Sequence, residues 1–230
     1  MAFEGFSASF FKFFRDLKKH NDRAWFEENK PRYRAEVQAP LSAFIHALAP
    51  LLAKTSPHFR CDPRPNGGSM FRIHRDVRFA KDKSPYKTHG SAQFRHDAGK
   101  DAHAPGFYLH LAPGEIFFGG GLWRPEPAAL QKIRTRIAER PADWKMAKEA
   151  ASIKKSYGGL REGEPLSRPP KGFDPEHPMI EDIKKRSFFV FRNADEAEAA
   201  SPAFVKLVAK TYADASPLMQ FLCTSVGAKF

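Results

Sequence analysis

Alternating apolar and polar positions run through the middle of the chain and predict β-strands there. In the segment Met70–Phe79, every second residue from Phe71 onward is apolar, except Arg75, and the residues between them are polar. A period of two is typical of a strand that turns one face to the core. Similar strands are predicted at Ser91–Arg95, Phe107–Leu111 and Glu115–Gly119. The three residues between the last two segments predict a tight hairpin.

Apolar residues three and four positions apart predict helices toward both ends of the chain. They indicate one helix from Ser9 to about His20 and a longer one from Pro31, kinked at Pro40. Asn21 or Asp22 is expected to cap a short turn between these two helices. Further helices are predicted at Pro125–Pro141, from Asp143 to Ala151, at Pro202–Tyr212 and at Pro217–Val226.

The order of these elements predicts an α+β fold with a mainly antiparallel sheet. A short strand near Phe59 and Cys61 and a late strand at Phe188–Phe191 bring the expected number to about five or six. Hairpin-length links between strands favour antiparallel pairing, with N- and C-terminal helices packed on the sheet. We expect residues 1–230 to form a single domain, because apolar runs recur along the chain with only modest polar gaps.

Charge narrows the possible partners without selecting one. The net charge is +12 and the pI is about 9.8, so the surface attracts nucleic acid, anionic membranes or small phosphorylated and carboxylated ligands. The basic residues are spread along the chain and do not form one tail, which is also compatible with a solvated basic surface.

The sequence gives no sign of a disulfide framework or of membrane insertion. The chain has only two cysteines, Cys61 and Cys223, and they lie far apart in the sequence. We therefore expect reduced, buried thiols. The N-terminal segment lacks the features of a signal peptide, and no stretch approaches the roughly 20 apolar residues of a membrane span. We therefore expect a cytoplasmic protein with no membrane partner.

The stretch Ser69–Gly90 concentrates the candidate chemistry. Six Arg or Lys and two Asp lie between its ends. Guanidinium groups bind phosphate or carboxylate in a bidentate manner, and lysines add point charges. Together with two later strands, this stretch predicts an anion site whose ligand-binding residues are Arg72, Arg78, Lys81, Lys83, Tyr86, Lys87, Tyr108, Trp123 and Arg124.

Two histidines and one aspartate in the same region are candidates for acid–base catalysis. His74 or His110 is placed to act as a general base near pH 7, with Asp76 to orient it. No nucleophile elbow, zinc motif or kinase motif accompanies them, so neither enzymatic activity nor a reaction follows, and no cofactor is indicated.

One arginine of this stretch is expected to hold the fold instead. Arg75 lies on the apolar side of the predicted strand, and an unpaired buried charge is costly. We expect it to pair with backbone carbonyls or with a carboxylate, such as a neighbour of Asp76 on the sheet, Glu27 or Glu28.

Two further segments have a structural and a functional interpretation. The run Gly119–Gly121 marks a bulge or a close approach of another backbone or of a ligand, and it matches no Rossmann or P-loop motif. The polar loop from His96 through Asp101 to His103 has residues that bind metals, but such loops are usually only solvated, and we predict no metal site there.

Several of these segments together carry a family resemblance. The pattern runs through Arg72–Thr88, through Tyr108–Leu111 with Gly119–Pro125, and through Arg168–Asp174 with His177-Pro178. In these residues, and over nearly the whole chain, the sequence resembles the bacterial and fungal family called domain of unknown function 2461. The resemblance implies one domain and a shared site, and it supplies no reaction.

Three functional classes remain open at this point. The first is an Arg/Lys/His-lined site for an anionic small molecule, either catalytic or for binding alone. The second is a non-specific nucleic-acid-binding module, in which the same cations follow the backbone while aromatic residues stack on bases. The third is a structural or protein-interaction role. The oligomeric state does not follow from the sequence.

Overall fold

The protein has an α+β fold built on one antiparallel sheet. The structure, a computed structural model, describes residues 2–98 and 104–230. The strands follow one another in both sequence and space, in the order β1 (Gly90–Arg95), β2 (Gly106–Ala112), β3 (Glu115–Leu122) and β4 (Phe188–Ala194). Each strand pairs antiparallel with the next. The predicted fold class is confirmed, but the described sheet has four strands and not five or six.

Helices precede and follow the sheet, as predicted. The N-terminal ones are α1 (Ala8–Lys19), α2 (Arg23–Arg32), the π-helical segment η1 (Tyr33–Gln38) and α3 (Ala39–Thr55). Between β3 and β4 lie α4 (Pro127–Glu139), α5 (Pro141–Lys148), α6 (Ala151–Tyr157) and α7 (Ile180–Ile183). The chain ends with α8 (Glu196–Ala199), α9 (Phe204–Asp214) and α10 (Ser216–Val226).

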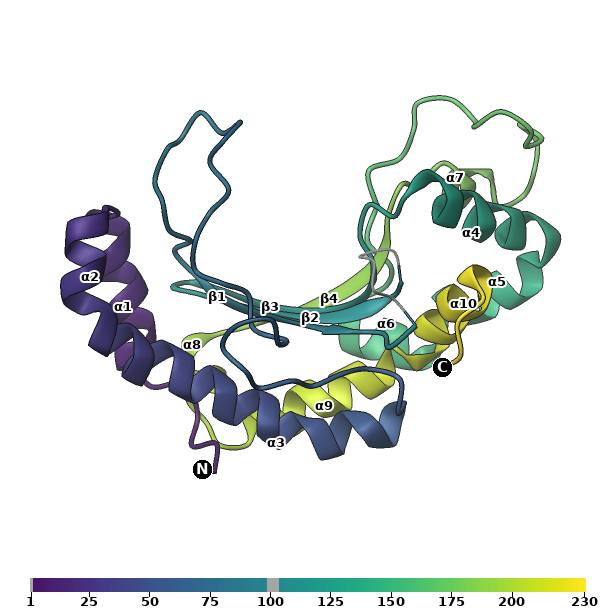
Figure 1. Cartoon of the computed structure of the whole chain (residues 1–230). Helices are drawn as coiled ribbons and strands as arrows, with labels where there is room; N and C mark the ends of the chain where they lie inside the picture. The colour runs from purple at the N-terminus through teal and green to yellow at the C-terminus, as the bar shows by residue number, and fades with distance from the viewer. Residues whose placement is uncertain (1, 99–103) are drawn as a thin grey trace.

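The two missing strands are extended segments without a full ladder. Phe59 makes only an isolated bridge to His96, and the predicted strand Met70–Phe79 makes only isolated bridges at Met70 and His74. Residues 69–89 instead form a long irregular hairpin, the arm, which continues outward from the edge of β1 (Figure 1). Its two limbs share bonds such as Lys87 N to Ile73 O, at 2.8 Å. The alternation of apolar and polar residues in Met70–Phe79 therefore indicates an extended backbone, but it does not show that the segment pairs along a sheet.

One face of the sheet is covered by helices. Figure 1 shows α3 and α9 beneath the sheet, and Phe107 of β2 stacks on Tyr212 of α9 with ring centroids 4.5 Å apart. Alternate residues of β2, which include Leu109 and Leu111, are completely buried on this face. The intervening residues point to the other face, which no helix of the described chain covers in Figure 1.

The glycine run in β3 allows β4 to approach closely. The pairing register of β3 with β4 is continuous from Ile116 to Leu122, so the run is not a bulge. A Cβ on Gly119 would collide with the carbonyl oxygen of Val190, and a Cβ on Gly121 would collide with that of Phe188. The close approach of another backbone is therefore what these glycines permit.

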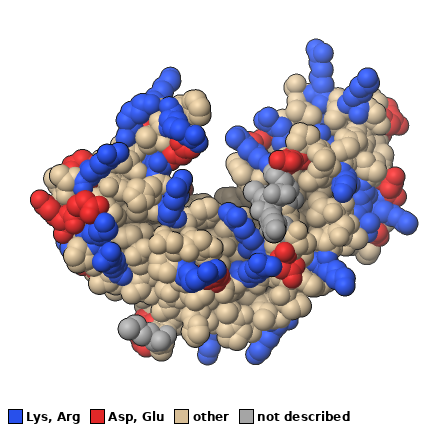
Figure 2. Space-filling model, viewed as in Figure 1, with Lys and Arg blue, Asp and Glu red and all other residues tan. Residues whose placement is uncertain are grey.

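The uncovered face of the sheet forms the floor of a trough. On one side of it stand α1, α2 and the arm, and on the other side stand α4, α7 and the loop from 158 to 179 (Figure 1). Figure 2 shows that the trough stays open when all atoms are drawn, with Lys and Arg side chains on both of its sides. The fold thus places the arm at one edge of an open, basic hollow.

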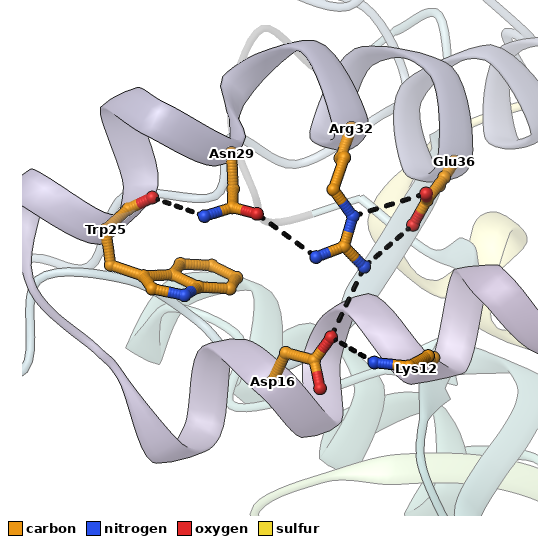
Figure 3. Close-up of polar contacts among 6 residues, drawn as sticks. All are labelled: Lys12, Asp16, Trp25, Asn29, Arg32 and Glu36. Atoms are coloured by element: carbon orange, nitrogen blue, oxygen red, sulfur yellow. Dashed lines mark hydrogen bonds and ion pairs between the residues drawn. The ribbon is translucent and has the colours of Figure 1, made fainter.

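A polar network fixes the helices beside the arm. Figure 3 shows it among Lys12, Asp16, Trp25, Asn29, Arg32 and Glu36. The Arg32 guanidinium donates to Asp16 of α1 at 3.3 Å and to both carboxylate oxygens of Glu36 in η1. The widened η1 turn ends two residues before Pro40, whose ring would crowd the carbonyl of Glu36 in a regular α-helix. The kink predicted at Pro40 takes the form of this π-helical segment.

No helix in the described part of the chain combines the length and the apolar character that crossing a membrane requires.

Candidate functional site

The base of the arm is anchored to the turn between α1 and α2. The Asn21 amide accepts from the Tyr86 backbone N–H at 3.1 Å and donates to the Tyr86 carbonyl at 3.0 Å, as a neighbouring strand would. The Tyr86 ring is buried and stacks on Phe26 of α2, with centroids 4.2 Å apart. Tyr86, a predicted ligand-binding residue, thus holds the arm in place.

Charged residues in the outer half of the arm mostly satisfy one another. Asp76 and Arg78 form an exposed ion pair at 2.7 Å. The Lys83 ammonium donates to the Val77 carbonyl at 3.0 Å and thereby closes the tip. Of the predicted cations in this part of the arm, Lys81 is exposed and forms no ion pair with any described residue.

Arg75 has a partner within the arm itself. Its guanidinium donates to the Asp82 carboxylate at 2.5 Å and to the Ser84 carbonyl at 3.2 Å. Asp82 also accepts from the backbone and hydroxyl of Ser84, and these hydrogen bonds, with Arg75, hold the Asp82 pKa well below its usual range. Arg75 thus pairs with both a carboxylate and a backbone carbonyl, as expected, and the carboxylate is that of Asp82 and not that of Glu27 or Glu28.

The three predicted catalytic residues lie in separate surroundings. The His74 ring lies beside Tyr86 and Phe26, with centroids 5.3 and 6.3 Å away. Asp76 binds Arg78 at the arm tip. His110 is on β2 in the uncovered sheet face. The contacts in the described chain therefore do not join His74, Asp76 and His110 into one acid–base group.

A different set of residues comes together where the arm meets the sheet. We call Arg72, Lys87, His89, Tyr108 and His110 the arm–sheet site. The Lys87 ammonium donates to the Arg72 carbonyl at 2.9 Å, and the His89 and His110 rings lie 4.3 Å apart between centroids. The Tyr108 hydroxyl and Nδ1 of His110 are 3.1 Å apart. Four of the five residues were among the predicted ones, and His89 was missed.

Burial and repulsion between basic groups dominate the electrostatics of the arm–sheet site, and the Glu115 carboxylate only partly opposes them at His89. The pKa of Lys87 is lowered, first by burial and then by repulsion from Arg72. Burial lowers the pKa of His110 to about 4, and burial followed by repulsion from His110 and Lys87 lowers that of His89 to about 4. Both imidazoles are therefore neutral at pH 7. No carboxylate of a described residue forms an ion pair with Arg72 or Lys87, although Asp76 attracts Arg72 from a greater distance.

A cavity of about 430 Å³ lies against this site. Its lining residues are Lys18, Asn21, Arg75, Asp82, Ser84, Tyr86, Lys87, Thr88 and His89. Lys18 at the end of α1 faces the cavity with Lys87, so two lysines without ion-pair partners in the described chain border it. A hollow of about 500 Å³ elsewhere, along α3 and α9, has neither histidine nor aromatic side chains in its wall, and we give it no role.

The remaining predicted residues lie across the sheet from the arm. Trp123 follows β3, is 55% exposed and packs edge-on against Phe189, with centroids 4.9 Å apart. Arg124 forms an ion pair with Glu164 at 2.6 Å. Trp123 and Arg124 therefore lie on the side of the trough opposite the arm.

Two histidines and an aspartate outside the arm–sheet site have the composition of a metal site. The nearest ligand atoms of His58, His96 and Asp97 lie within 4.8 Å of one another. Both ring nitrogens of His96 are already engaged, however, Nε2 with the Lys229 carbonyl at 2.6 Å and Nδ1 with the Ala98 N–H at 3.0 Å. Asp101 and His103 of the same predicted polar loop lie outside the described residues. We assign no metal to this group.

Comparison with known proteins identifies a family and no activity. No curated protein and no solved structure matches the chain. The family model described as "Conserved hypothetical protein (DUF2461)" matches residues 9–221, which include the arm, the whole sheet and most of the helices. The chain belongs to the DUF2461 family.

Proposed function

We propose that the protein binds an anionic ligand carrying a phosphate or carboxylate group at the arm–sheet site. The observation that carries the proposal is the pair Arg72 and Lys87, which the arm holds near each other without an ion-pair partner in the described chain. Arg72 is exposed, but Lys87 is partly buried, and a desolvated cation raises the free energy of the folded state unless an opposite charge compensates it. A bound anion supplies that charge.

The neighbouring groups suit such a ligand. Arg72 offers a planar guanidinium for two oxygens, and Lys87 offers a point charge. The neutral rings of His89 and His110 each carry one N–H donor, and Tyr108 adds a hydroxyl. The adjoining cavity of about 430 Å³ is in the size range of small-molecule sites.

The proposal is limited to binding. A general base needs a proton to abstract and a partner that orients it, and Asp76 is engaged with Arg78 at the arm tip. His89 and His110, with a pKa of about 4, are weak bases at neutral pH. We therefore assign no reaction to this site.

A thermal-shift panel tests the proposal. At 20 mM salt, inorganic phosphate, pyrophosphate, citrate and AMP are added to the wild type, to Lys87→Met and to Lys145→Met, whose lysine is exposed on α5. A ligand at 100 times its Kd raises the melting temperature by roughly 5–10 °C. We expect at least one compound to do so with the wild type and Lys145→Met, and the shift to vanish with Lys87→Met. No shift with any compound, or an equal shift in all three proteins, would overturn the proposal.

A further inference from the structure

Six aromatic rings form a continuous row across the uncovered face of the sheet. We call this set the aromatic row, and in spatial order it consists of Phe71, Tyr108, Phe117, Phe191, Phe189 and Trp123. Successive ring centroids are 6.2, 5.8, 5.4, 6.1 and 4.9 Å apart. The row begins in the arm, crosses β2, β3 and β4, and ends just after β3, so it spans the floor of the trough.

These rings are not part of the buried core. Their neighbours in sequence Phe107, Phe118 and Phe188 are completely buried against the helices. Every ring of the aromatic row keeps some exposure, up to 55% for Trp123. Large apolar rings gathered on an open concave surface are typical of a binding face.

Cations accompany the aromatic row beside Phe191, within the row, and beside Phe71, at one of its ends. The Arg161 guanidinium lies 3.9 Å from the centroid of Phe191 and donates to the Phe191 carbonyl. Its Nε is buried without a hydrogen-bond partner, and within the described ranges Arg161 forms no ion pair. At the Phe71 end of the row the Lys87 ammonium lies 5.1 Å from the Phe71 centroid. Figure 2 shows Lys and Arg side chains on both sides of the trough.

We propose that the aromatic row binds single-stranded nucleic acid, with bases stacked on the rings and phosphates held by the cations. The inference rests on the proposed function, because the arm–sheet site provides one of the phosphate contacts. Stacking on aromatic side chains combined with a positive groove is the common mode of single-strand binding. The net charge of +12 favours this polyanion over a neutral polysaccharide or an apolar peptide.

The geometry sets three properties of the complex. Single strands bind more tightly than duplex, because paired bases cannot reach the rings. Binding tolerates many sequences, because every base has a flat face. The length of the row corresponds to on the order of four to six nucleotides, at the lower end of the sizes known for single-strand sites.

Fluorescence anisotropy with a labelled oligo-dT 12-mer, in DNA and RNA forms and as a duplex, tests this inference. Phe191→Leu and Trp123→Leu remove a ring but keep an apolar side chain. Phe79→Leu is the matched control, because Phe79 is 94% exposed at the arm tip and lies outside the row. We expect Phe191→Leu and Trp123→Leu each to weaken single-strand binding about 5- to 20-fold, and Phe79→Leu to leave it unchanged. Arg161→Met should lower the slope of log affinity against log salt by about one.

The outcomes separate this inference from the proposed function. A phosphate-induced thermal shift that needs Lys87, without detectable oligonucleotide binding at 20 mM salt, overturns the nucleic-acid inference and leaves the anion site standing. Oligonucleotide binding that is unchanged in all the leucine variants would also overturn the nucleic-acid inference. So would equally tight binding of duplex, heparin or polyglutamate, because either result would mean attraction by charge only. Trp123 is exposed, so Trp123→Leu stays informative if Phe191→Leu fails to fold.

Discussion

The two halves of the arm carry similar charges and differ in how those charges are satisfied. In the outer half, Arg78 pairs with Asp76 and Arg75 pairs with Asp82, so each guanidinium has a carboxylate from the arm itself. At the base, Arg72 and Lys87 have none in the described chain, and Lys87 is partly buried. The same density of basic residues thus includes paired and unpaired cations. We therefore base the proposed binding site on the partly buried Lys87, which has no ion-pair partner in the described chain, and not on charge density.

The largest expected effect comes from detaching the base of the arm. Tyr86→Ala removes a buried ring that stacks on Phe26, and such truncations cost about 3–5 kcal/mol of unfolding free energy. We expect a loss of this size in urea titrations followed by circular dichroism. Phe79→Ala at the tip should cost almost nothing. A loss below about 1 kcal/mol for Tyr86→Ala would show that the arm is not anchored there.

The two histidines of the arm–sheet site should make the protein sensitive to mild acid. Their folded-state pKa of about 4 lies below the ordinary value of about 6.5, so the unfolded chain binds protons first as the pH falls. Their contribution to stability is complete above pH 6.5 and is lost between pH 6.5 and 4. After allowance for partial solvation, we expect a loss of about 1–2 kcal/mol per histidine.

Urea titrations at pH 7 and pH 4.5 measure this effect. The difference between the two pH values should shrink in His89→Gln and in His110→Gln, and it should persist in His46→Gln, whose histidine is exposed on α3. An unchanged difference in the first two variants would contradict the neutral histidine pair.

Removing a carboxylate from the outer half should destabilise the arm by a smaller amount. Asp82→Asn weakens the ion pair with Arg75 and the hydrogen bonds to Ser84, and we expect a lower melting temperature together with faster proteolysis within the arm. Lys83→Met, which opens the tip near Val77, should act in the same direction. Proteolysis unchanged in both variants would mean that these contacts do not order the tip.

Removing a cation from the base of the arm should have the smallest effect on stability, and it should stabilise the protein slightly where the changes above destabilise it. Lys87→Met takes away a charge that burial already disfavours, so without ligand its melting temperature should match or slightly exceed that of the wild type. A clear decrease in differential scanning calorimetry would indicate that Lys87 is structural, and Lys145→Met provides the baseline.

Much of the fold could be predicted because local patterns determine it. The hairpin at Ala112–Glu115, the strand Gly90–Arg95 and the C-terminal helices appeared close to where periodicity placed them. The arm is not a regular strand although its residues alternate. Alternation indicates only an extended backbone, whereas a strand also needs a hydrogen-bonded partner strand along its whole length. Of the two predicted capping residues, Asn21 and Asp22, it is Asp22 that caps α2.

The site was harder to predict, for two physical reasons. Arg75 finds its carboxylate seven residues later, across a turn that charge counting does not reveal. Phe117 and Phe191 stand in runs where both faces of the strand are apolar, so the sequence cannot separate an exposed ring from a core ring. His89 and Arg161 lie outside any regular pattern, and only the fold brings them to the trough.

The most direct test of the account compares the two halves of the arm in one titration. Isothermal calorimetry at 20 mM salt, with the strongest ligand from the thermal-shift panel, measures Kd for the wild type, Lys87→Met and Arg78→Met. We predict at least tenfold weaker binding for Lys87→Met, which corresponds to about 1.4 kcal/mol, and wild-type affinity for Arg78→Met. Equal weakening in both variants would mean that net charge alone attracts the ligand and would contradict a specific site at the base of the arm.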